Sequence, residues 1–151
     1  MTTVFVDSNV VVYVLARKDP EKQRQAQGWL RRLGPFDLLT LSPQVLNEAY
    51  SVLTLKYRLD PDADGVRAAL GRYMRWVRAP LNVQTITDAW ALQDRYDVRI
   101  WDALLIASAN QAACTYFLSE DLNDGQRYGR VQAINPFRHA PEDVLGRASR
   151  N

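Results

Sequence analysis

The chain has 151 residues, of which 47% are hydrophobic and 24% are charged, with a formal net charge of +2. This balance excludes a disordered chain, and because a domain of this length buries roughly 70% of its unfolded surface, we expect one domain with its own core. The N-terminus lacks a leader-like pattern and the longest apolar run, residues 10–16, is too short to span a bilayer, so we expect a cytoplasmic protein.

The chain begins with an apolar, β-prone run at residues 3–6 that ends on Asp7, which is typical of a buried strand. Residues 10–15 are ambiguous, because their β-branched side chains suit a strand whereas the polar residues before them can cap a helix. Pro20 opens a predicted helix with apolar residues at three-to-four spacing, which Gly34 stops.

A second apolar run, at residues 38–41, predicts another strand. Ser42 and Pro43 follow as a helix cap and a proline at the first helical position, and apolar residues continue the helical spacing to Lys56. Glu48 lies within this helix, at the margin of its apolar stripe. A further amphipathic helix is predicted from about residue 62 to residue 77.

In the C-terminal half, residues 83–86 predict a third strand, after which Thr87 caps a helix that runs to about residue 96. Residues 100–113 are apolar on nearly every side, with Asp102 as the lone charge near their start, which describes a buried helix. Two more strands and an intervening turn complete the pattern, at residues 115–118, residues 131–134, and Asp124-Gly125.

Strands that alternate with helices predict an α/β fold with a central parallel sheet, in which ligands bind beyond the carboxyl ends of the strands. Acidic residues lie at positions that should meet at this edge, namely Asp7, Glu48, Asp102 and Asp121. Clustered carboxylates raise one another's pKa unless a cation shares the site. We therefore predict a metal centre at this edge of the sheet.

The predicted ligands are all hard oxygen donors, without cysteine or histidine, so the expected ion is Mg²⁺ or Mn²⁺ and not zinc. Such ions orient and deprotonate water and stabilise the phosphate during hydrolysis of RNA. A ribonuclease that uses paired imidazoles is excluded because His139 is the only histidine. Cys114 is the only cysteine, which excludes an intrachain disulfide and favours a small core residue.

The basic side chains are mostly arginine, since lysine occurs only at Lys18, Lys22 and Lys56. Arginine binds phosphate through a planar fork, which suits a nucleic-acid partner, although genomic base composition produces the same bias. Arg95 and Arg99 are candidates to hold RNA phosphates near Asp102, and simple solvation is their alternative role.

Several short motifs follow one another in a characteristic order along the chain, namely Asp7-Ser8-Asn9, Asn47-Glu48, residues 101–109 (WDALLIASA), residues 118–125 (LSEDLNDG) and Asn135-Pro136-Phe137. In order and spacing they resemble the PIN domain, and in particular the VapC-type toxins of prokaryotic toxin–antitoxin pairs. The resemblance implies a three-layer α/β/α fold, Mg²⁺- or Mn²⁺-dependent endoribonuclease activity, a homodimer and inhibition by a cognate antitoxin. It implies a PIN-like domain at residues 1–140, a C-terminal tail at residues 141–151, and a helix at residues 10–15.

By position, the resemblance assigns the three acidic residues that such domains share to Asp7, Glu48 and Asp102. Asp121 matches a more variable fourth acid, for which Asp124 is a second candidate. It also implies that Asn9 and Ser119 support the site by hydrogen-bonding a carboxylate or a water on the metal, so both belong to the expected site.

Ordinary structural roles are the alternative for each acid. Asp7 suits a helix cap, Glu48 suits a solvated helix face, and Asp121 and Asp124 lie in a turn-like stretch where aspartate is common. Asp102 near a helix N-terminus interacts favourably with the helix dipole, by about 0.3 to 1 kcal/mol. That small gain does not by itself explain a carboxylate in so apolar a segment.

Other functions fit the residues less well. A phosphoaccepting receiver domain needs a late lysine, and no lysine follows Lys56. A haloacid-dehalogenase-type phosphatase needs an acid or threonine two positions after its nucleophile, where this chain has Asn9. A PIN-like RNA-processing nuclease and a non-catalytic module that binds RNA or protein remain as alternatives to the toxin.

Overall fold

A computed structural model describes residues 2–56 and 63–147. Its sheet has the strand order β2-β1-β3-β5-β4. The parallel strands are β1 (Val4–Val6), β2 (Leu39–Thr40), β3 (Tyr116–Leu118) and β5 (Val131–Ile134). This α/β fold with a largely parallel sheet confirms the predicted fold class. β4 (Arg127–Tyr128) was not predicted; it pairs antiparallel with β5 at the sheet edge, and two residues are too short to show a strand pattern.

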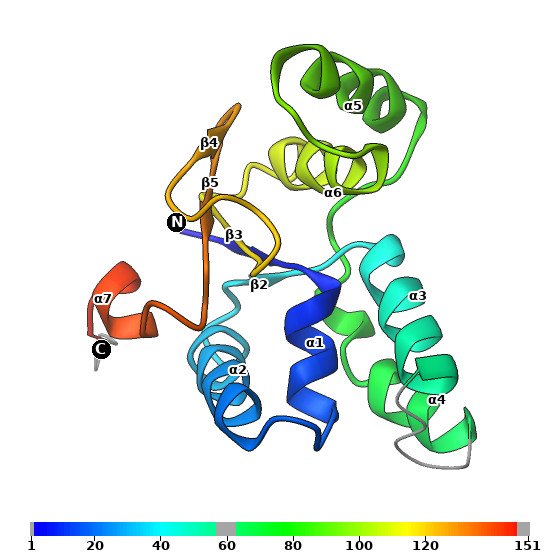
Figure 1. Cartoon of the computed structure of the whole chain (residues 1–151), viewed down its shortest axis with the longest axis vertical. Coiled ribbons are helices and arrows are strands. Elements are labelled where there is room, and N and C mark those ends of the chain that lie inside the picture. The colour runs from blue at the N-terminus through cyan, green and yellow to red at the C-terminus, as the bar shows by residue number, and fades with distance from the viewer. Residues whose placement is uncertain (1, 57–62, 148–151) are drawn as a thin grey trace.

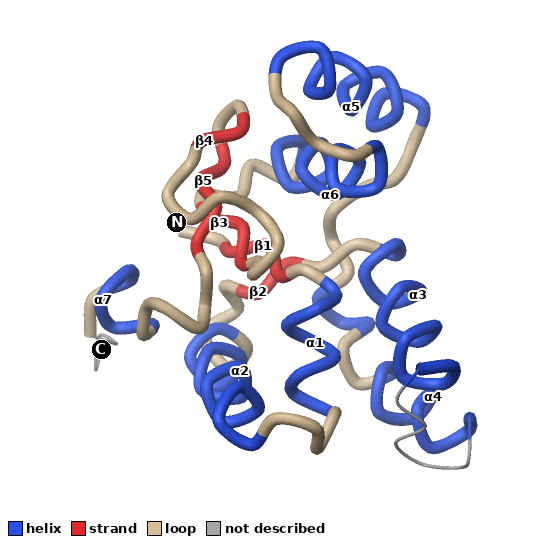
Figure 2. The backbone as a smooth tube through the Cα atoms, viewed as in Figure 1, coloured by secondary structure: helices blue, strands red, loops and turns tan. Residues whose placement is uncertain are grey.

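Helices cover the sheet on both sides (Figure 1). Figure 1 shows α1 (Ser8–Leu15) and α2 (Pro20–Leu33) below the strands, with α3 (Pro43–Ser51) beside α1. Above the strands lies α6 (Ile100–Gln111), with α5 (Val83–Arg95) stacked on it. Figure 2 shows how short the strands are relative to the helices around them.

Local capping explains where the N-terminal helices begin. The Asp7 side chain accepts a hydrogen bond from the Ser8 backbone, so α1 starts directly after β1 and residues 10–15 are helical, as the family resemblance implied. Ser42 caps α3 through the Val45 amide, with Pro43 in the first turn, as predicted. α3 then continues into the π-helical η1 (Val52–Lys56).

The predicted strand at residues 83–86 is wrong, because α5 begins there. The Asn82 side chain accepts from the Thr85 amide at 3.0 Å, and the Thr85 hydroxyl accepts from the Asn82 amide at 2.9 Å. This reciprocal capping box outweighs the β-branched residues that suggested a strand.

The predicted helix from about residue 62 to residue 77 is also wrong in extent. Residue 62 lies outside the described residues; α4 (Ala63–Gly71) ends on a glycine, and the 3₁₀ turn η2 (Met74–Trp76) follows. Glycine is a poor helix former, and Val77 instead forms a parallel bridge with Leu41 at the sheet edge.

The core lies on both faces of β1 and β3, where the Phe5 and Phe117 rings stack with centroids 4.9 Å apart. Cys114 is buried and free, as expected. The C-terminal segment is attached to this core through buried Trp29, whose Nε1 donates to Pro136 O at 3.1 Å and to His139 O at 3.0 Å. The helix α7 (Pro141–Leu145) follows it. No helix in the described ranges is long and apolar enough to cross a membrane.

Candidate metal centre

Asp7 is a buried carboxylate at the carboxyl end of β1, with 4% of its surface exposed. Its Oδ1 accepts from Ser8 N at 2.6 Å, and its Oδ2 accepts from Ser119 Oγ at 2.8 Å. The pKa of Asp7 is raised to about 7, chiefly by burial; the hydrogen bonds from Ser119 and Ser8 oppose this rise, and the charges of Glu48 and Asp102 add to it. The negative charge of the Asp7 carboxylate is therefore not fully offset by its hydrogen bonds.

Ser119 reaches Asp7 because β1 and β3 are neighbouring parallel strands. Val6 lies opposite Leu118 in the sheet register, so the residues that follow these two strands end at the same edge. Ser119 is fully buried there, and its hydroxyl oxygen also accepts a hydrogen bond from the Asp121 amide at 3.1 Å.

Asn9 links the ends of both strands. Its Nδ2 donates to Asp121 Oδ2 at 3.0 Å, and lies 3.3 Å from both Asp7 Oδ2 and Ser119 Oγ. Its Oδ1 is buried and accepts no hydrogen bond from the described residues. The structure thus brings Asn9 and Ser119 into contact with the carboxylates that they were expected to support.

Glu48 joins the site because α3 packs beside α1. Ser8 Oγ donates to Glu48 Oε2 at 2.9 Å. Gln44 Nε2 donates to Glu48 Oε1 at 2.7 Å and to the Trp101 carbonyl oxygen at 3.1 Å. These contacts connect three elements, α1, α3 and α6, around the Glu48 carboxylate.

Asp102 lies in the first turn of α6, and 21% of its side chain is exposed. Burial raises the pKa of Asp102, the nearby Arg99 guanidinium lowers it, and the charges of Asp121 and Glu48 raise it; the net direction is upward. Arg99 Nε lies 3.7 Å from Asp102 Oδ2, and 78% of the Arg99 side chain is exposed. Most of that guanidinium therefore remains accessible to an anion from solution.

One cavity of about 320 Å³, here called the acid cavity, is lined by Asp7, Glu48, Asp102 and Asp121. Asp124 does not line it. Asp124 Oδ1 accepts from Asn135 N at 2.9 Å, and its Oδ2 lies 2.6 Å from His139 Nε2, so this carboxylate holds the turn before β4 to the C-terminal segment. Arg95 does not line the acid cavity either and lies against the Tyr96 ring, whereas Arg99 lines it.

No three histidine, cysteine, aspartate or glutamate side chains within residues 2–56 and 63–147 are close enough, as they stand, to hold an ion. Hydroxyl and amide donors occupy the carboxylates instead. The donor chemistry fits a hard cation, because oxygen ligands converge on a cavity that contains a buried carboxylate, and the buried Asn9 Oδ1 has no partner among the described residues.

Sequence reasoning assigned no role to Ser8, Gln44 or Trp101, all of which contact the acids or line the acid cavity. Gln44 had a usable signal, since it lies four residues before Glu48 and therefore on the same helix face. The contact between Ser8 and Glu48 had none, because forty residues of chain separate them.

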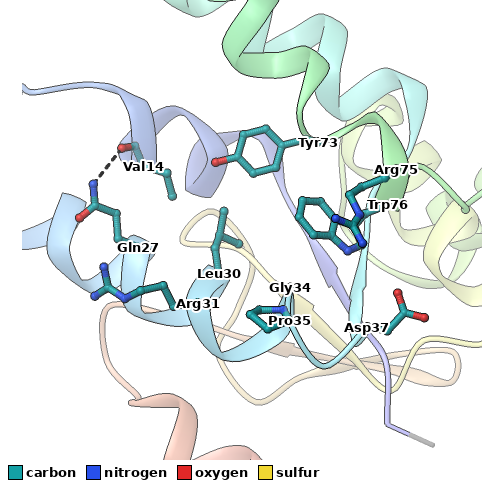
Figure 3. A pocket seen from close by; sticks show the side chains of 10 residues that line it. All are labelled: Val14, Gln27, Leu30, Arg31, Gly34, Pro35, Asp37, Tyr73, Arg75 and Trp76. Atoms are coloured by element: carbon teal, nitrogen blue, oxygen red, sulfur yellow. Dashed lines mark hydrogen bonds between the residues drawn. The ribbon is translucent and has the colours of Figure 1, made fainter.

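A larger cavity of about 830 Å³ lies between α2 and η2 (Figure 3). Figure 3 shows Leu30, Tyr73 and Trp76 on its walls and Asp37 at one side. Asp37 is the one acid among its described lining residues, and it is paired with Arg78. Metal-dependent hydrolysis of a phosphodiester needs clustered oxygen ligands like those of the acid cavity, which this larger cavity does not offer.

A family model for the PIN domain matches residues 4–128. No curated protein matches the sequence. The structure of FitAcB from Neisseria gonorrhoeae is similar, with a TM-score of 0.66 and 16% identity over 91% of this chain and 100% of that chain.

The structure of VapC20 from Mycobacterium tuberculosis, described as a toxin that cleaves the sarcin–ricin loop, has a TM-score of 0.59 and 20% identity, covering 86% of this chain and 99% of that chain. DNA-bound VapBC from Salmonella typhimurium has a TM-score of 0.61 and 11% identity, covering 88% of this chain and 97% of that chain. At these identities the likeness to solved structures demonstrates a shared fold.

Proposed function

The chain belongs to the PIN domain family, and from this premise we propose that it is a metal-dependent endoribonuclease that acts as the toxin of a toxin–antitoxin pair. PIN domains are nucleases. The observation that carries the proposal is the acid cavity, in which Asp7, Glu48, Asp102 and Asp121 from four separate segments line one space of about 320 Å³.

The same residues are the ligands that we propose for Mg²⁺ or Mn²⁺. Burial raises the pKa values of Asp7 and Asp102, which a cation at the site would oppose, and Glu48 and Asp121 add oxygen donors to the same cavity. When bound, such an ion supplies positive charge that makes a water molecule more acidic and polarises the phosphoryl oxygens of RNA.

The remaining side chains orient the ligands and the substrate. Ser119 and Asn9 hold Asp7 and Asp121 at the strand ends, while Ser8 and Gln44 hold the two oxygens of Glu48. Arg99 carries an accessible guanidinium at the rim, and we assign it to a non-bridging phosphate oxygen of the RNA.

A non-catalytic module that binds RNA or protein is the second candidate. The observation in its favour is that protein donors already bond Asp7, Glu48 and Asp121, with no three acids of the described chain gathered closely enough for an ion. Retention of all four acids around one cavity favours the enzyme instead, since a module without chemistry gains nothing from their repulsion.

Cleavage assays separate these candidates. Purified protein is incubated with transfer and ribosomal RNA and Mn²⁺, and wild type is compared with Asp7→Asn and with Asp94→Asn, an exposed acid on α5 that serves as a matched control. We expect cleavage by wild type and Asp94→Asn only. No cleavage by wild type, or equal cleavage by Asp7→Asn, contradicts the nuclease.

We further propose that the chain forms a homodimer and that a cognate antitoxin protein inhibits it. The fold shared with the FitAcB and VapBC structures supports the proposal of an antitoxin partner. Co-expression with the product of any short open reading frame that adjoins the gene should suppress cleavage, and sedimentation should give twice the chain mass. An active chain whose neighbouring gene product has no effect would instead be a PIN-like RNA-processing nuclease.

A further inference from the structure

A second cavity adjoins the acid cavity and shares a wall with it. It has a volume of about 510 Å³, and Glu48, Ser51 and Trp101 line both spaces. The rest of its lining includes Leu81 and Leu104. Because Glu48, Ser51 and Trp101 line both spaces, a nucleotide next to a phosphate in the acid cavity would lie beside this second space, here called the side cavity.

Trp101 is the large aromatic group at the boundary between the two cavities. It precedes Asp102 at the start of α6, and 61% of its surface is exposed. Gln44 donates both to the Trp101 carbonyl oxygen and to Glu48, so the backbone beneath the indole is tied to one of the acids. The exposed indole is therefore accessible to a ligand that enters the side cavity.

The lining of the side cavity matches the chemistry of a nucleobase. Trp101 offers an aromatic face, Leu81 and Leu104 offer apolar contacts, and the Asn47 amide offers a donor and an acceptor, whereas Gln44 Nε2 already donates to Glu48 and Trp101. A planar heteroaromatic ring with polar edges satisfies all three, because aromatic side chains stack on unpaired bases while amides hydrogen-bond their edges. The volume lies within the range typical of small-ligand sites.

We propose that the side cavity is a base-binding site, in which the Trp101 indole stacks on an unpaired nucleobase next to the phosphate held in the acid cavity. The proposal rests on the proposed function and deepens it by naming a base subsite beside the acid cavity. Such a subsite takes an unpaired base, because a paired base in an A-form stem keeps both faces stacked.

A protein surface is the competing occupant. α5 carries an exposed apolar stripe at Val83, Ile86 and Trp90, whose spacing places all three on one helix face. None of these three residues lines the side cavity. Glu48 and Asn47 in the lining give a base polar partners that the apolar side chains of a second copy would leave unpaired.

Binding to intact RNA tests the proposal without relying on cleavage. The background is Asp7→Asn in EDTA, and the probes are short single-stranded RNA oligonucleotides with 2-aminopurine at successive positions, with the matched duplexes alongside. In the background protein we expect single strands to bind more tightly than duplexes, with 2-aminopurine quenched at one position. Trp101→Ala should weaken single-strand binding roughly 5- to 100-fold and abolish the quenching.

Two further variants test whether the loss of binding comes from the stacking ring at position 101. Trp101→Phe should retain most of the affinity, because a phenyl ring still stacks. Trp90→Ala removes an indole that is 57% exposed but lies outside the side cavity, and it should bind like the background protein. Thermal unfolding of each variant reports any loss of fold.

The outcomes that overturn the proposal are distinct. Unchanged binding by Trp101→Ala, or no RNA binding by the background protein, contradicts the base site. A Trp101→Ala protein whose sedimentation mass falls assigns the indole to an interface between copies and also overturns it. Stacking through Trp101 without cleavage by wild type in Mn²⁺ contradicts the nuclease alone and leaves the base site standing.

Discussion

The acid cavity has two sides that differ in how they are held. On the strand side, Asp7 and Ser119 are buried, and short hydrogen bonds to neighbours at the sheet edge fix them. On the helix side, Glu48 and Asp102 are partly exposed and contact the longer, more exposed Gln44 and Arg99. The strand side is therefore preorganised, and the helix side has the freedom to adjust when an ion or RNA binds.

Loss of either side should abolish cleavage, and this is the largest expected effect. Asp7→Asn and Asp102→Asn each remove a proposed ligand charge, and we expect the rate to fall roughly a thousandfold or more. Rates of RNA cleavage in Mn²⁺ measure this. If Asp102→Asn alone retains activity, the helix side is not part of the metal centre.

The strand side should make the metal-free protein sensitive to pH. The pKa of Asp7 is about 7 in the folded protein, against an ordinary value of 3.8 for aspartate. The folded state therefore binds a proton at Asp7 more tightly than the unfolded state does. The protonated Asp7 carboxyl contributes its whole stabilisation of the fold below about pH 4. This contribution to the free energy of unfolding, about 4 kcal/mol, is lost as the pH rises to about 7.

Urea unfolding in EDTA at pH 5 and pH 8 measures this loss. Asp7→Asn should lose roughly 2 to 4 kcal/mol less than wild type between the two pH values, and Mn²⁺ should restore wild type at pH 8. Equal pH profiles for the two proteins would show that Asp7 is solvated in solution.

Two serines compare the sides directly. Ser119→Ala leaves a buried Asp7 oxygen without its hydroxyl donor, and we expect a loss of about 1 to 3 kcal/mol in the free energy of unfolding. Ser8→Ala removes a hydroxyl that is partly exposed and bonds Glu48, so its cost should be about 1 kcal/mol or less. Equal costs in denaturant unfolding at pH 5 would remove the distinction between the two sides.

The smallest effect on stability should come from the helix-side rim. Arg99→Gln breaks an ion pair of 3.7 Å whose arginine is largely exposed, and exposed pairs of this kind contribute about 0 to 1 kcal/mol. We expect an unchanged unfolding midpoint but a raised KM for RNA, since the proposed phosphate contact is lost. A lower kcat with an unchanged KM would contradict this assignment.

The elements that sequence predicted well are those whose signals are local. The apolar run before Asp7, the Ser42-Pro43 start of α3 and the apolar helix around Asp102 each depend on neighbours within a few positions, and each is present in the structure. The prediction of a strand at residues 83–86 is wrong, because the β-branched residues favour a strand whereas the capping box of Asn82 and Thr85 begins a helix.

What the sequence determined by itself is therefore the set of strand and helix ends at which acids occur, since capping and hydrophobic periodicity are short-range effects. Only the tertiary structure decided which side chains meet there. The register of β1 against β3 pairs Asp7 with Ser119, and α3 packing beside α1 brings Glu48 to Ser8. The tertiary structure also placed Asp121 at the acid cavity and Asp124 against His139. The sequence could not decide between these two aspartates, because contacts between residues far apart in the chain leave no local pattern.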